Sequence, residues 1–94
     1  MTPKDIRTIL KHLELAEHSL DPLDEEYAKN PENEALEAEW ASAFKKEREL
    51  HDKLEAAIVE ITGGKIDRKV AHGLVGKHRE ALKDLLALGE EGAA

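Results

Sequence analysis

Apolar residues recur in steps of three and four from residue 6 to residue 27, and the spacing continues through a proline at position 22. A second stripe follows between residues 36 and 61. Side chains three and four positions apart share one face of an α-helix, so each stripe predicts a long amphipathic helix. The stripes consist of Ile6, Ile9, Leu13, Ala16, Leu20, Leu23 and Tyr27, and of Leu36, Trp40, Ala43, Glu47, Leu50, Leu54, Ala57 and Ile61.

The first helix is expected over residues 3–29. Thr2 suits the capping position before it, and Pro3 suits its first turn, where a backbone N–H has no partner within the helix. Pro22 lies inside the stripe, and an internal proline removes a backbone hydrogen bond at a cost of ~3 kcal/mol. We therefore expect the helix to be kinked or broken near Pro22.

Two short signals bound the second helix. Asn30 and Pro31 predict a corner followed by a helix over residues 31–62, with Asn30 as its cap. A glycine pair at positions 63 and 64 predicts the end of this helix, because glycine adopts the left-handed backbone conformation without strain.

A third helix is expected over residues 66–88, with His78 on its apolar face. Gly73 and Gly76 weaken it by ~1 kcal/mol each relative to alanine, but the apolar spacing continues past both. Residues 1–89 are predicted to form a single helical domain, and residues 90–94 a flexible tail.

Two long helices joined by a short corner predict an all-α fold: an antiparallel helical hairpin with the third helix along one end. The third helix is shorter than the second, so only two helices cover the far end of the hairpin. The apolar residues there are the predicted interaction surface: Leu23, Tyr27, Leu36 and Trp40. Exposed apolar area favours a partner, and a second copy would give a dimeric helical bundle. The alternative is that long Glu and Lys side chains cover this area.

The net charge of −7 opposes binding to nucleic acids or anionic membranes. The charge is unevenly distributed, because residues 14–39 sum to −9 and residues 65–83 to +4. The basic third helix could contact phosphates, but it has no aromatic residue to stack on bases, so pairing with acidic residues of the same assembly is the favoured interpretation. The chain has no cysteine and no apolar run typical of a signal peptide or membrane span, and a cytoplasmic location is expected.

Glu47 occupies a position in the second stripe where Leu or Ile is expected, and His51 follows it one turn later. Folding the chain at its two corners brings further carboxylates and an imidazole to a similar level. Such groups projecting inward from facing helices can bind a transition metal, which is the alternative function for this chain. The candidate ligands are Glu14, Glu17, Glu47, His51 and His78. The simpler interpretation is that Glu47 pairs with a Lys or Arg.

Two acidic patterns, Glu14-Leu15-Ala16-Glu17 and Glu49-Leu50-His51-Asp52, resemble the paired helix motifs of the all-α nucleotide pyrophosphohydrolases, which hold magnesium. The resemblance covers eight residues. Because Leu50 points inward between Glu49 and Asp52, we do not assign the chain to that family.

No strong catalytic or nucleotide-binding motif is present in the sequence, and neither of its two serines, Ser19 and Ser42, lies in a nucleophile turn. The sequence therefore predicts a small non-enzymatic protein that acts through protein–protein interaction and self-association, with no cofactor.

Overall fold

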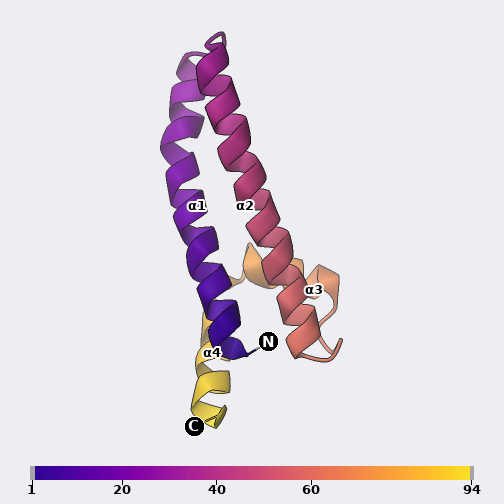
Figure 1. The fold of residues 1–94 in the computed structure, drawn as a ribbon. Coiled ribbons are helices and arrows are strands. Elements are labelled where there is room, and N and C mark those ends of the chain that lie inside the picture. Colours follow the sequence, from indigo (N-terminus) through magenta and orange to yellow (C-terminus); the bar gives the residue numbers. More distant parts are fainter. Residues whose placement is uncertain (1, 94) are drawn as a thin grey trace.

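The computed structural model describes residues 2–93, with side chains as far as Leu88. Four helices and no strand lie in this part of the chain: α1 (Pro3–Lys29), α2 (Glu34–Ile61), α3 (Arg68–Val75) and α4 (Arg79–Ala93). The two long helices, α1 and α2, lie side by side, and the two short ones lie at the end of this pair where the N-terminus is found (Figure 1). The predicted all-α class is confirmed.

The start of α1 follows the prediction. Thr2 caps the helix: its hydroxyl accepts a hydrogen bond from the Asp5 backbone N–H at 3.2 Å, and the Asp5 carboxylate accepts one from the Thr2 N–H at 2.9 Å. This reciprocal pair satisfies two donors that the first helical turn leaves without partners. Pro22 is accommodated inside α1, which remains one helix as far as Lys29, so of the expected kink or break the break does not occur.

The start of α2 differs from the prediction by three residues. Asn33, not Asn30, is its cap, with a side chain that accepts a hydrogen bond from the Leu36 N–H at 3.1 Å. Asn30 instead ends α1, where its backbone N–H donates to the Glu26 carbonyl oxygen at 3.0 Å. Either asparagine can cap a helix, and the choice between them depends on the backbone path of the turn.

Glycine ends α2 as predicted. Gly63 and Gly64 have φ angles of 60° and 84°, in the left-handed region. The Gly64 N–H donates to the Val59 carbonyl oxygen at 3.0 Å, which satisfies one of the free acceptors of the last turn.

The predicted single helix over residues 66–88 is wrong, because the structure has two helices there. Asp67 caps α3 by accepting a hydrogen bond from the Val70 N–H at 2.9 Å, and α3 ends at Val75 with Gly76 as its C-terminal cap. Gly73 and Gly76 lower the cost of interrupting a helix, and the interruption lets α3 pack on α2 while α4 packs on α1. The predicted tail begins inside α4, whose backbone continues to Ala93, and Ala94 lies outside the described residues.

The main hydrophobic core lies where all four helices meet. It consists of Ile6, Ile9, Leu10, Leu13, Leu54, Ala57, Ile58, Ala71, Val75, Leu82 and Leu86. Further along the long helices, Leu20 and Leu36 are also buried but belong to no such cluster. We call residues 20–44 the two-helix end, because α3 and α4 do not reach this part of the α1–α2 pair (Figure 1).

Stability should depend on the four-helix core. Leu54 is completely buried, whereas Leu85 of α4 is 49% exposed. We expect Leu54→Ala to lower the free energy of unfolding by about 2–5 kcal/mol, because it removes buried area and leaves a cavity. Leu85→Ala should change it by less than about 0.5 kcal/mol. Urea unfolding followed by circular dichroism measures both values, and equal losses would contradict this position of the core.

Candidate functional site

Three aromatic side chains cluster on the two-helix end. The Trp40 ring lies 5.2 Å from the Tyr27 ring in an edge-to-face arrangement, and also 5.2 Å from the Phe44 ring in a stacked one. The Trp40 indole N–H donates to the Asp24 carboxylate of α1, so the ring has both an apolar and a polar contact. The contacts of Trp40 with Tyr27 and Asp24 connect α2 to α1 where no third helix supports them.

The predicted interaction surface is only partly accessible. Leu36 is buried at 9% exposure, and Leu23, Tyr27 and Trp40 are half-buried. Phe44 of the same end is 42% exposed and was not part of the predicted surface. It lies outside the apolar stripe but four residues after Trp40, a spacing that could have indicated a shared helical face.

The entire net charge of the protein is located at the two-helix end. Residues 20–44 contain eight acidic residues and one lysine, a sum of −7. The remaining thirteen acidic and thirteen basic residues balance. All nine charged side chains of the two-helix end are exposed, so the net negative charge of this end lies at its surface.

A groove runs between α1 and α2 next to the two-helix end, with which it shares Ala43. Its volume is about 470 Å³, and it is lined by His12, Leu15, Ala16, Ser19, Ala43, Lys46 and Leu50. Leu15 is 64% exposed at this groove, and no acidic residue lines it. The groove is thus an accessible apolar surface of a different electrostatic character from the two-helix end.

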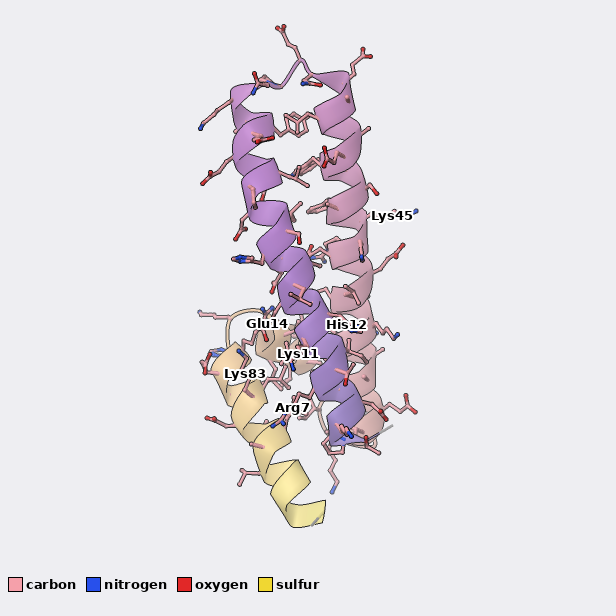
Figure 2. All side chains as sticks on the ribbon, turned by 60° about the vertical axis from the view of Figure 1, so that its left-hand side comes forward. Arg7, Lys11, His12, Glu14, Lys45 and Lys83 are labelled. Carbon is pink, nitrogen blue, oxygen red and sulfur yellow. The ribbon has the colours of Figure 1, made fainter. Side chains whose placement is uncertain are left out.

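Two of the predicted metal ligands make ion pairs with α4. Arg79 donates from Nη1 and Nη2 to the two carboxylate oxygens of Glu17, the second bond measuring 3.0 Å. Lys83 Nζ donates to Glu14 at 3.2 Å, and Figure 2 shows this pair bridging α1 and α4. The hydrogen bond to Glu17 raises the pKa of Arg79 above its ordinary value. These contacts hold α4 on α1, as expected for pairing between the acidic and basic segments.

The other predicted ligands, Glu47, His51 and His78, do not gather with Glu14 and Glu17 into one site. Glu47 is buried at 8% exposure, and its charge contributes to raising the pKa of Arg79. His78 is exposed rather than on an apolar face, because it lies in the interruption between α3 and α4. Within the described residues, the five predicted ligands do not form one group of potential donors.

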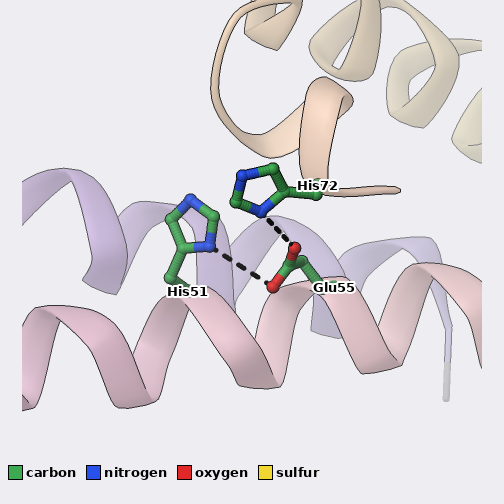
Figure 3. Close-up of side chains that lie close together, drawn as sticks. All are labelled: His51, Glu55 and His72. Carbon is green, nitrogen blue, oxygen red and sulfur yellow. Dashed lines mark hydrogen bonds and ion pairs between the residues drawn. The ribbon is translucent and has the colours of Figure 1, made fainter. Parts of the chain in front are cut away.

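A different group forms around Glu55, a residue outside the predicted ligand set. His51 and Glu55 project from successive turns of α2, and His72 projects toward them from α3 (Figure 3). The Glu55 carboxylate lies 2.7 Å from His72 Nδ1 and 3.5 Å from His51 Nδ1. His51 and Glu55 are buried, and His72 is exposed. The i, i+4 spacing of His51 and Glu55 was a usable signal, but the position of His72 depends on how α3 docks.

The positions that resemble pyrophosphohydrolase motifs face different surroundings. Glu14 and Glu17 pair with α4, while Glu49 is exposed and Asp52 lies 3.9 Å from Arg68 of α3. No protein-family model matches the chain, and a search of curated proteins and of solved structures finds no match either. In the described residues no helix combines the length and apolarity needed to cross a bilayer.

Tyr27 gives a test of the electrostatics at the two-helix end. Burial of the phenol, together with the neighbouring Glu37 carboxylate, raises its pKa above the ordinary value of 10.0. Because the folded pKa exceeds the unfolded one, the protonated Tyr27 phenol contributes stability below pH 10. This contribution is lost as the pH rises through the folded pKa. Tyr27 is the chain's only tyrosine, so ultraviolet absorbance can follow its ionisation directly.

We expect Glu37→Gln to lower the pKa of Tyr27 part of the way toward 10.0, because the contribution of burial remains. Glu39→Gln removes one charge from the same helix and should have a smaller effect. An ordinary pKa in the native protein would contradict the described packing of Tyr27.

Proposed function

We propose that this protein is a non-enzymatic helical interaction protein that pairs with a second copy through the α1–α2 groove and uses its two-helix end to bind a basic protein surface. The observation that carries the proposal is that the whole net charge and the aromatic cluster with its exposed Phe44 lie on the same end of the molecule. Both features lie on the part of the molecule that is not covered by α3 or α4.

Charge supports a basic partner. A local sum of −7 on about one quarter of the chain produces a concentrated negative potential, which attracts a positively charged surface and accelerates encounter. Three basic residues of the protein's other half are paired within that half, so they do not neutralise it. Arg79 is paired with Glu17, and Lys83 with Glu14. Arg68 is paired with both Asp52 and Glu55.

The aromatic cluster supplies an anchor that charge alone lacks. Protein interfaces concentrate binding energy in a few aromatic side chains surrounded by polar residues. Phe44 is exposed and stacked on Trp40, and the indole N–H of Trp40 is already bonded to Asp24. An apolar side chain of a partner can therefore cover Phe44 without leaving a polar group unpaired.

The groove supports pairing with a second copy. Two α1–α2 pairs that meet at this apolar surface give a four-helix arrangement, a common way of burying two-helix layers. Two ends of −7 repel each other, so the two copies should run in opposite directions with their acidic ends apart. This arrangement leaves both two-helix ends free for a basic partner.

Binding of a basic partner can be tested with a synthetic amphipathic helix of leucine and lysine. Trp40 is the only tryptophan, so its fluorescence reports docking at the two-helix end. We expect this binding to weaken with added salt. The double substitution Glu25→Gln with Glu26→Gln should weaken it about fivefold, since two exposed ion pairs of about 0.5 kcal/mol each contribute about 1 kcal/mol together.

The matched control is Glu49→Gln with Glu60→Gln, which changes the net charge equally but outside the two-helix end. It should leave the affinity nearly unchanged. Equal weakening by the two double variants would contradict a localised site, as would affinity that is independent of Phe44→Ala.

Self-association is tested at the groove. Leu15 and Leu88 are both 64% exposed, but only Leu15 lines the groove. We expect Leu15→Glu to weaken the dimer at least about tenfold, because burying a leucine contributes about 1.5–3 kcal/mol. Leu88→Glu should not affect it. Sedimentation velocity over a concentration series measures this, and a native protein that remains monomeric throughout would refute the dimer.

A further inference from the structure

We propose that His51, Glu55 and His72 form a binding site for a divalent first-row transition-metal ion, with Zn²⁺ as the probe cation. The three side chains come from two helices, α2 and α3, and His72 lies seventeen residues after Glu55 in the sequence. The site is independent of the two-helix end and of the groove, so it can exist whether or not the protein binds a partner there.

The separations between the donor atoms are close to what a metal ion requires. Zinc bonds of ~2.0–2.1 Å in tetrahedral geometry place two ligand atoms about 3.3 Å apart. The Glu55 oxygens lie 2.7 Å and 3.5 Å from the Nδ1 atoms of His72 and His51, and one donor atom from each residue falls within 4.8 Å of the others. His72 is exposed on the short α3, so rotation of its side chain can complete the approach.

His51 supplies the second, independent observation. Its side chain is 8% exposed, and Nδ1 is buried with no hydrogen-bond partner among the residues that the structure describes. The 3.5 Å approach to Glu55 is an ion-pair distance without hydrogen-bond geometry. A buried nitrogen left without a partner costs about 1–3 kcal/mol. Coordination to a cation would satisfy this atom, which points at the same carboxylate that His72 contacts (Figure 3).

The chemistry of the donors selects the class of ion. Two imidazoles and one carboxylate form a donor set used by zinc, and imidazole also suits copper, nickel and iron. Calcium and magnesium require oxygen ligands and should bind weakly. Three protein ligands leave a further coordination position, and it would face the solvent on the exposed His72 side.

Arg68 is the competing cation. Its Nη2 atom lies 3.8 Å from Glu55 and 3.9 Å from Asp52, and it also donates to the Asp52 carbonyl oxygen at 3.3 Å. The Arg68 side chain is 56% exposed, so it can turn to Asp52 and the solvent when a metal ion binds Glu55. Removing this competitor, as in Arg68→Gln, should therefore increase metal affinity.

Calorimetric titration of the full chain with Zn²⁺, after removal of metals by a chelator, tests the proposal. We expect one Zn²⁺ per chain, no comparable heat with Mg²⁺, and a shift of the His51 ring nitrogen signal in NMR spectra. His72→Ala, an exposed substitution that should preserve the fold, ought to weaken binding at least about 100-fold, beyond the 10–100-fold cost of losing an outer-shell contact. His18→Ala is the control, because it removes an exposed histidine of α1, a helix that contributes no ligand to the site.

Three results would overturn the proposal: no stoichiometric Zn²⁺ binding by the native protein, undiminished binding by His72→Ala, or equal weakening by His72→Ala and His18→Ala. Circular dichroism confirms that each variant is folded before titration. Dependence on Glu14→Gln or His78→Ala instead would place a metal at the residues first expected from the sequence, and would equally refute this site.

Discussion

The packing of α1 against α2 determines the rest of the structure. These helices bring two apolar stripes together, and Leu13 and Leu54 are completely buried between them and the short helices. The helices are far longer than α3 and α4, and the molecule measures 51 × 22 × 20 Å. A long pair with a short cover necessarily has an uncovered part, and the proposed interaction surfaces lie there.

The interruption at Gly76 determines how the two short helices pack on the long ones. A single straight helix would lie along one groove, whereas the two segments pack on different partners. As a result, His72 of α3 contacts Glu55 of α2, and Arg79 and Lys83 of α4 pair with carboxylates of α1. The polar contacts of this half of the molecule therefore depend on one local feature of the backbone.

The division of charge follows the same geometry. Where helices meet, acidic and basic side chains pair across them, and the sum for that part of the chain is zero. At the two-helix end, no third helix brings basic groups, and the acids remain in solvent. Solvation makes this arrangement tolerable, because repulsion between exposed charges is weak in water and screened by salt.

The sequence alone determined the helical class, the two long stripes, the Thr2 cap and the glycine stop, because each depends on residues close together in the chain. It also marked Glu47 as a buried exception within a stripe. Only the tertiary structure decided which asparagine caps α2, that the last helix divides, and that Glu55 rather than Glu47 meets two histidines. Those outcomes depend on how one helix docks on another, and side chains brought together from separate helices have no fixed spacing in the sequence.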